Sequence, residues 1–321
     1  MNTPAISVVM GVCNGAGHLP ETIASVLAQT EPDWEFILVN DGSTDPAVEA
    51  LLAEYAQRDA RIRLITKAHA GLTRALADGC AAARGEYIAR IDVGDAMLPE
   101  RLARQRAVFE QEPRMAFVSC WTEFCGPRWE RIEIKKEQPT GAAGMPILAP
   151  LPAAHLLSGP THHASVMFRR AAYEAAGGYR WQFYYGQDWD LWYRLAEQGW
   201  FHVVPQVLQR IRLFPAGISP QARGKQTALG RLAQEAFRAR RTGENEAPVL
   251  EQAAALRPAP GPAQPPARRS QAAGLYFIGR LLLRNRDRRC RSYFLQSLRT
   301  WPLQGRAWAG WLLSALTGNE P

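Results

Sequence analysis

Strand-like and helix-like segments alternate through the first 120 residues of this 321-residue chain. Between the apolar runs, hydrophobic residues recur three or four positions apart, as Leu19, Ile23 and Val26 do, which is the spacing of one helix face. Strands that alternate with helices form parallel sheets with helices on both faces. The alternation therefore predicts an α/β fold with a Rossmann-like, mostly parallel sheet. The expected strands are 6–12, 35–40, 62–66, 87–91 and 115–120.

Two carboxylates, Asp92 and Asp95, follow the fourth expected strand. In α/β proteins, ligands bind at the carboxyl ends of parallel strands, and Mg²⁺ is held by one or two carboxylates together with substrate phosphates. The pair is therefore a candidate for a site that holds a metal and a diphosphate. An ordinary turn before a helix that starts near Pro99 is the alternative interpretation.

Asp41 stands at the end of the second expected strand, in the segment Val-Asn-Asp-Gly-Ser-Thr-Asp (39–45). An acidic residue at this position can accept hydrogen bonds from a ribose or a base, as in nucleotide-binding α/β folds. The alternative is a tight turn at Gly42, followed by a helix that Asp45 or Thr44 caps.

Further motifs follow in a fixed order. The opening strand, Ile-Ser-Val-Val-Met-Gly-Val-Cys-Asn (6–14), precedes the two acidic segments, and the remaining motifs are His-Ala-Ser-Val-Met-Phe-Arg-Arg (163–170), Gly-Gly-Tyr (177–179) and Gln-Asp-Trp-Asp-Leu-Trp (187–192). This succession resembles glycosyltransferase family 2, whose members are inverting enzymes with the GT-A fold. The resemblance covers residues 4–220.

The resemblance implies that the first half binds a nucleotide-sugar donor. Asp41 matches the position that contacts the nucleoside. Val12 and Asn14 stand at positions that line the base and the ribose. Asp92 matches the residue that meets ribose, metal and diphosphate. The resemblance does not determine the nucleobase of the donor, which is expected to be a UDP- or dTDP-sugar.

Asp188 matches the general base of the family. Inversion is a single in-line displacement, so a carboxylate must take the proton of the attacking acceptor hydroxyl. Asp188 is expected at a helix N-terminus, where the helix dipole favours its ionised form; in isolation an ordinary helix cap would explain it. His163, Arg169 and Arg170 are expected to contact the acceptor or a phosphate.

The chain departs from the family at two candidate metal ligands. Gly94 stands where members commonly carry a third carboxylate, and Phe214 replaces a histidine. Asp95, with or without Asp92, could then hold Mg²⁺ or Mn²⁺. Alternatively, Arg212, Arg169 or Arg170 supply bidentate phosphate contacts in place of a tight metal site.

The remainder of the chain predicts an added helical part. We expect a GT-A domain over 1–220, with a nucleotide-sugar half (1–120) and an acceptor half (121–220) in which 121–160 is irregular. A helical extension (221–256), a Pro-rich linker (257–267) and a basic, tetratricopeptide-like helical hairpin (268–321) follow.

Charge and composition constrain the location. Ten arginines and one acid, Asp287, lie between positions 268 and 306, a charge excess that attracts an anionic membrane surface unless it is only the solvated face of the hairpin. The tail lacks an aromatic platform for nucleic acid. The five cysteines are scattered, as is typical of cysteines that stay reduced. The sequence shows neither a signal peptide nor a run of roughly 18 apolar residues. We expect a cytoplasmic protein, peripheral on the inner face of the membrane.

The sequence therefore favours an inverting glycosyltransferase that uses a glycan or lipid-linked acceptor in bacterial surface-polysaccharide assembly. The alternative is a catalytically altered scaffold that binds nucleotide-sugar. The altered 92–95 segment suits the scaffold, whereas the presence of Asp188 favours the enzyme.

Overall fold

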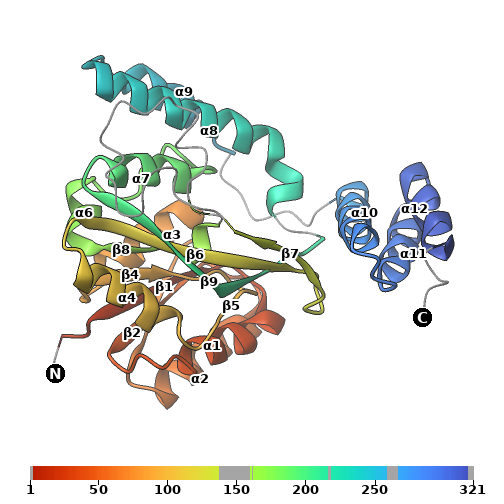
Figure 1. The fold of residues 1–321 in the computed structure, drawn as a ribbon, viewed down its shortest axis with the longest axis horizontal. Coiled ribbons are helices and arrows are strands. Elements are labelled where there is room, and N and C mark those ends of the chain that lie inside the picture. The colour runs from red at the N-terminus through yellow and green to blue at the C-terminus, as the bar shows by residue number, and fades with distance from the viewer. Residues whose placement is uncertain (1–2, 137–159, 161, 216–217, 259–266, 317–321) are drawn as a thin grey trace. The chain divides into compact units, whose positions relative to one another are not determined.

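The computed structural model describes residues 3–136, 160, 162–215, 218–258 and 267–316 (Figure 1). The chain forms two compact units. Within the described residues, the first unit draws on 1–122, 135–211 and 227–260, and the second on 123–134, 212–226 and 261–321. Most of the expected Pro-rich linker, and of the expected irregular segment 121–160, lies outside the described residues.

One nine-stranded sheet has the order β3-β2-β1-β4-β8-β6-β9-β5, with β7 paired to β6. Its first four strands are parallel, whereas β8 runs antiparallel to both β4 and β6, and β5 antiparallel to β9. The strands are β1 (Ile6–Val12), β2 (Trp34–Asp41), β3 (Ile62–Lys67), β4 (Tyr87–Arg90), β5 (Ala96–Met97), β6 (Met115–Cys125), β7 (Arg131–Lys135), β8 (Met167–Arg169) and β9 (Trp200–Arg212).

Helices cover both faces of the sheet, as the sequence predicts. Successive side chains of a strand point to opposite faces, and in β1 Val8 and Met10 join one apolar core while Val9 joins the other. The first core receives α1, α2 and α4, and the second receives α3, α6 and α7. The helices among the described residues are η1 (Ala16–His18), α1 (Leu19–Leu27), α2 (Pro46–Arg58), α3 (Leu72–Ala81), α4 (Arg101–Gln111), η2 (His163–Ser165), α6 (Arg170–Ala175), α7 (Gln187–Ala196), α8 (Ile218–Thr242), α9 (Ala247–Ala255), α10 (Arg268–Arg284), α11 (Cys290–Thr300) and α12 (Gly305–Leu316).

One local expectation differs from the structure. Strand β6 continues to Cys125 and β7 follows it, inside the segment expected to be irregular. Helix α4 begins at Arg101, two residues after Pro99, near which its start was expected. The short strand β5, which pairs with β9, lies between Asp95 and this helix.

The second unit contains the helices α10, α11 and α12. Their core surrounds Phe294, and a Cβ added at Gly279 or Gly310 would lie 2.9 or 2.6 Å from its ring, so both positions require the absence of a side chain. Within this unit, Tyr293 donates a hydrogen bond to Glu130 at 2.7 Å. The helical tail expected from the sequence is therefore present, and it contains three helices among the described residues.

Candidate functional site

The carboxyl ends of β1, β2 and β4 meet at one edge of the sheet. β1 runs parallel to both neighbours, with Val12 opposite Asn40 and Val9 opposite Arg90. The segments after these strands therefore carry Asn14, Asp41 and Asp92 to the same edge, where α/β folds bind ligands.

Asn14 joins the ends of β1 and β2. Its backbone has a positive φ of 63°, a conformation that asparagine tolerates better than most residues. Its side-chain carbonyl accepts hydrogen bonds from the backbone N–H groups of Thr44 (2.9 Å) and Asp45 (3.2 Å). Asp45 in turn caps α2. Val12 is buried in the core, so only its backbone borders this edge.

Asp41 is buried, and both of its carboxylate oxygens are engaged. They accept hydrogen bonds from the backbone N–H groups of Ala70 and Gly71, each at 2.8 Å. Gly71 has φ of 91°, and an added Cβ there would lie 2.5 Å from the ring of Tyr184. Asp41 thus fixes the loop before α3. Its Oδ2 also lies 2.9 Å from the Nδ1 of His69, so Oδ1 is the oxygen better placed to accept from a nucleoside hydroxyl or N–H.

The loop of residues 92–95 is shaped by a glycine and a threonine. Gly94 has φ of 95°, which strains any residue with a side chain. The Thr22 hydroxyl accepts a hydrogen bond from the Gly94 N–H and donates one to the Asp95 carbonyl, both at 2.9 Å. The residue that replaces the family's third carboxylate is therefore the one that the turn itself requires.

Arg90 holds Asp92 in place. Its fully buried guanidinium donates to the carbonyls of Val9 (3.0 Å) and Ile91 (2.8 Å) and to the Asp92 carboxylate (2.5 Å). Burial opposes ionisation of Asp92, but attraction to the Arg90 guanidinium, together with its hydrogen bond, lowers the pKa of Asp92 to about 2. Asp92 is therefore an anion at neutral pH.

Asp92, Asp95 and His162 lie together. One potential ligand atom from each lies within 4.8 Å of the others, and this is the only such group of His, Cys, Asp or Glu in the part of the chain that the structure describes. The oxygens of two carboxylates are ligands that Mg²⁺ and Mn²⁺ prefer. The residues present therefore fit the cation that the fold implies.

His163 contacts Tyr179. Its Nε2 atom and the Tyr179 hydroxyl form a hydrogen bond of 2.7 Å, and the side chain is buried. Burial lowers the pKa of His163 well below its usual range, and Arg90 lowers it further. A neutral His163 thus forms part of the wall behind Asp92.

Asp188 is the second residue of α7, which begins where the sequence predicts. Burial raises the pKa of Asp188 to about 6, against hydrogen bonds from the backbone N–H groups of Trp189 and of Asp188 itself, and the negative charge of Asp92 raises it further. Loss of hydration therefore outweighs the helix dipole that was expected to favour the ionised form. The effect of Asp92 also indicates that the two carboxylates share one environment.

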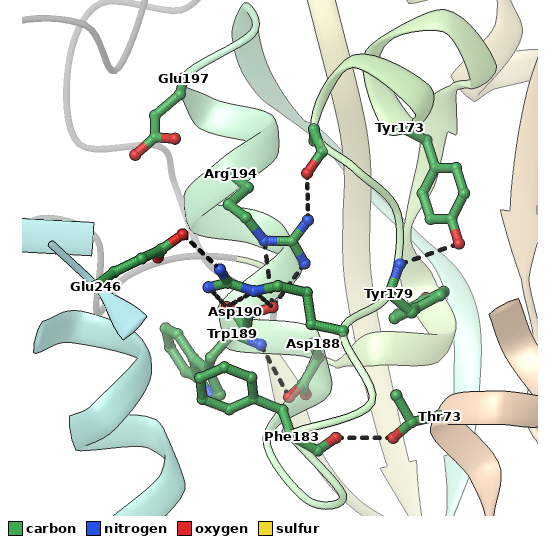
Figure 2. A network of polar contacts seen from close by, with 12 residues as sticks. Thr73, Tyr173, Tyr179, Phe183, Asp188, Trp189, Asp190, Arg194, Glu197 and Glu246 are labelled. Atoms are coloured by element: carbon green, nitrogen blue, oxygen red, sulfur yellow. Dashed lines mark hydrogen bonds and ion pairs between the residues drawn. The ribbon is translucent and has the colours of Figure 1, made fainter. Parts of the chain in front are cut away.

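An ion-pair cluster fixes the helix that carries Asp188. Asp190 accepts hydrogen bonds from Arg194 at 2.6 Å and from the Arg180 Nε at 3.1 Å. Arg180 also pairs with Glu246 at 2.8 Å, just before α9. Figure 2 shows Asp188 and Asp190 on the same helix, with Asp188 bonded to the Trp189 N–H and Asp190 bonded to Arg194.

Two of the three arginines proposed for phosphate lie at the other end of β4. Arg169 pairs with Tyr87 across the sheet, at the start of β4 and so at the opposite end of that strand from Asp92. It contacts Glu86, and Arg170 contacts Glu174 and the Gly85 carbonyl. Arg212 belongs to the second unit, where it stacks on Trp129 with 4.2 Å from Cζ to the ring centroid. Arg169 and Arg170 are therefore not brought to the carboxylates.

Sequence reasoning missed His162, Arg90 and Thr22. An arginine inside an otherwise apolar strand was a signal for Arg90, because a fully buried charge needs a partner nearby. His162 adjoins the predicted His163, and nothing in the sequence distinguishes which imidazole faces the carboxylates. Thr22 gave no local signal, since its partners are more than 70 positions away.

Comparisons with known proteins agree with this fold. The family model described as glycosyl transferase family 2 matches residues 7–175. The putative glycosyltransferase EpsE of Bacillus subtilis (strain 168) is 32% identical over 61% of this chain and 68% of its own length. The O-antigen biosynthesis protein RfbC of Myxococcus xanthus is 38% identical over 36% of this chain and 9% of its own length.

A solved structure shares the architecture. The crystal structure of S. aureus TarS 1-349 in complex with UDP aligns over 96% of this chain and 88% of that chain, with a TM-score of 0.54 and 13% identity. This similarity concerns the fold alone. The family model covers more than half of the chain, and the protein is a member of glycosyl transferase family 2.

Proposed function

We propose that this protein is an inverting transferase that moves a sugar from a UDP- or dTDP-sugar to a glycan or lipid-linked acceptor in the assembly of a bacterial surface polysaccharide. The description of RfbC as an O-antigen biosynthesis protein supports the polysaccharide context, and the UDP bound to TarS supports the nucleotide. The observation that carries the proposal is that Asp188, at the start of α7, has a pKa of about 6, raised in part by the charge of Asp92, whereas Asp92, held by Arg90, has a pKa of about 2. Groups whose environments separate their pKa values take different roles in catalysis.

Asp188 is the base in this proposal. A carboxylate with a pKa of about 6 is ionised at neutral pH and is a stronger base than an ordinary aspartate. It takes the proton of the acceptor hydroxyl as that oxygen attacks the anomeric carbon, and the nucleoside diphosphate leaves from the opposite face. The cluster around Asp190 keeps Asp188 in position for this step.

The donor occupies the edge formed by β1, β2 and β4. We assign the nucleoside to the segments of Asn14 and Asp41, beside the backbone of Val12, and the diphosphate to Asp92 and Asp95. A divalent cation bound by these two carboxylates would neutralise the charge of the leaving diphosphate. Arg90 keeps Asp92 ionised and correctly oriented.

A thermal-shift screen tests the donor assignment. A ligand that binds only the folded state raises its stability by mass action, so UDP- or dTDP-sugars with Mn²⁺ should raise the melting temperature, and GDP- and CMP-sugars should not. Release of nucleoside diphosphate from the same mixtures reports turnover. Stabilisation without turnover, even with acceptor glycans added, would favour the scaffold alternative, and no stabilisation by any donor would contradict the proposal.

We further propose that the second unit rests on an anionic membrane surface. Three apolar side chains of α12 are largely exposed: Trp308 (50%), Leu312 (60%) and Leu313 (54%). All ten arginines of the tail are also exposed. Apolar residues on one helix together with surrounding cationic side chains are typical of helices that lie in the membrane interface. Among the described residues, no helix combines the length and apolarity that crossing a bilayer would require.

A further inference from the structure

Two arginines lie against one exposed tryptophan in the segment that precedes α7. The side chain of this residue, Trp181, is 46% exposed. The Cζ atom of Arg257, which follows α9, lies 4.9 Å from the centroid of the Trp181 ring, and that of Arg74, on α3, lies 5.8 Å from it. All three residues belong to the first unit. Two positive charges therefore meet at one aromatic ring that is still open to solvent, and we call these three residues the Trp181 cluster.

The guanidinium groups of the Trp181 cluster keep their hydrogen-bond donors. A guanidinium that lies over an aromatic ring interacts through its charge and its flat face, and its five N–H groups stay in its own plane. In the described part of the chain, neither Arg74 nor Arg257 pairs with a carboxylate, whereas the nearby Arg180 pairs with Asp190 and Glu246. Two like charges without a counter-ion repel each other, so an anion that binds both is favoured.

On one side, the cluster borders the edge assigned to the nucleoside. The Cζ atom of Arg257 also lies 6.0 Å from the ring centroid of Tyr184, in the same segment as Trp181. Tyr184 packs on Gly71, where an added Cβ would lie 2.5 Å from its ring. The N–H of Gly71 is the group that donates to Asp41. The segment that carries Trp181 is therefore in contact with the loop that Asp41 fixes.

On the other side, the same segment leads to the proposed base. It continues directly into α7, whose second residue is Asp188. The Thr73 hydroxyl, next to Arg74 on α3, donates to the Phe183 carbonyl at 2.8 Å and so ties the segment to α3 (Figure 2). A ligand held by the Trp181 cluster would therefore lie near both the nucleoside edge and the start of α7.

We propose that Trp181, Arg74 and Arg257 form a subsite for the acceptor, and that this acceptor is a glycan whose sugars carry an anionic group, a carboxylate or a phosphate. The apolar C–H face of a sugar ring packs on an aromatic ring, and the guanidinium groups pair with the anion. The inference rests on the proposed function and specifies the chemical class of its acceptor. The donor does not need this cluster, because its diphosphate is assigned to Asp92 and Asp95.

Calorimetry with paired probes tests the inference. The full chain, saturated with UDP or dTDP and Mn²⁺, would be titrated with trigalacturonate and with its methyl ester, which has the same rings without the charge. Glucose 6-phosphate and glucose form a second pair, so the two pairs distinguish a carboxylate from a phosphate. We expect the charged member of at least one pair to bind about tenfold more tightly than the neutral one, since hydrogen bonds between charged groups are among the stronger ones.

Variants of the cluster should change this binding in different ways. R74Q/R257Q should remove the preference for the charged probe, a loss of about tenfold, and leave the neutral probes unchanged. W181A should weaken binding of both members of a pair, and W181F, which keeps an aromatic ring, should recover part of it. R58Q/R104Q is the matched control: it makes the same change of charge on α2 and α4, which pack on the opposite face of the sheet from α3, and should keep the preference.

The affinity for UDP or dTDP separates the possible outcomes. It should be the same in all of these variants, which also shows that each variant is folded. A lower nucleotide affinity in W181A or in R74Q/R257Q would place the cluster in the donor site and overturn the inference. Equal binding of charged and neutral probes in both pairs, an undiminished preference in R74Q/R257Q, or unchanged binding in W181A would overturn it while nucleotide binding still supported the proposed function. If the unmodified protein bound neither nucleotide, the proposed function itself would fail.

Discussion

Individual side chains at this site owe their chemistry to their surroundings. Asp92 and Asp188 are the same residue type, yet the guanidinium of Arg90 stabilises one anion and burial destabilises the other. Asp92 therefore stays charged at neutral pH, as the proposed diphosphate site requires, and Asp188 can accept a proton near neutral pH. This division follows from burial and from one buried arginine, neither of which is visible in the motifs alone.

The pH dependence of activity should report Asp188. Because the base must be ionised and the pKa of Asp188 is about 6, we expect kcat/KM to rise about tenfold per pH unit below about pH 6 and to level off above about pH 7. Rates of nucleoside diphosphate release between about pH 5 and about pH 8 would show this limb. D59N, which alters an aspartate paired with Arg61, should keep the same profile, and a flat profile in the unmodified protein would contradict the assignment.

Stability should respond to the same group with a definite sign. The folded pKa of Asp188 exceeds the unfolded value of about 3.9, so the folded state holds its proton longer and loses stability as pH rises from about 4 to about 6. D188N removes this penalty. We expect the variant to be more stable at pH 7.5 by on the order of 1 kcal/mol, because the side chain is only partly buried, and the gain to vanish near about pH 4. Thermal melts across this range measure it, and a variant less stable at every pH would refute the explanation.

At the scale of secondary-structure elements, α7 depends on the cluster around Asp190. Asp190 is 1% exposed and pairs with both Arg180 and Arg194. Removal of one partner of a buried ion pair leaves an uncompensated charge and costs roughly 3–5 kcal/mol. The neighbouring contacts of Arg180 with Glu246 and of Arg194 with the Ala176 carbonyl soften this loss.

We therefore expect D190A to lower the free energy of unfolding by about 3 kcal/mol, measured by urea denaturation. E54Q, which breaks the exposed pair with Arg58, is the matched control and should cost less than about 0.5 kcal/mol. Equal effects of the two variants would show that the cluster does not stabilise α7.

Local pattern predicts some of these elements and not others. The parallel strands and α7 follow from hydrophobic periodicity and are confirmed at nearly the expected residues. The pairing of β8 with β4, which moves Arg169 away from Asp92, joins segments about 80 positions apart and has no local signature. The hydrogen bond from the Ala164 N–H to His162 likewise depends on the backbone geometry of η2. Strand ends could therefore be placed from sequence, whereas side-chain directions at the site could not.

At the scale of the whole molecule, the chain combines a near-neutral catalytic unit with a strongly basic helical one. The ten arginines between positions 268 and 306 are exposed, and the only acid in that range, Asp287, pairs with Arg289. An anionic surface would attract such a unit before any apolar side chain inserts. Attraction should therefore depend on salt, and retention on the apolar side chains of α12.

Vesicle sedimentation of the full chain tests this expectation. We expect binding to vesicles with anionic phosphatidylglycerol, little binding to pure phosphatidylcholine, and release at about 0.5 M salt. Replacing Leu312 and Leu313 by serine leaves the charge unchanged and should weaken binding about tenfold, since each removes exposed apolar area. Replacing exposed Ala309 by serine is the control and should have little effect. Equal binding to both lipids would contradict the charge argument, and unchanged binding of the double variant would contradict insertion.

The central claim, that Asp188 is the base of a sugar transfer, is tested most directly by comparing D188N with the unmodified protein on the nucleotide-sugar that stabilises it. The measurements are the melting-temperature rise and the rate of nucleoside diphosphate release, both with Mn²⁺ at pH 7.5. The predicted result is an equal rise in melting temperature and a rate at least about 100-fold lower in D188N. Equal rates in the two proteins would contradict the claim.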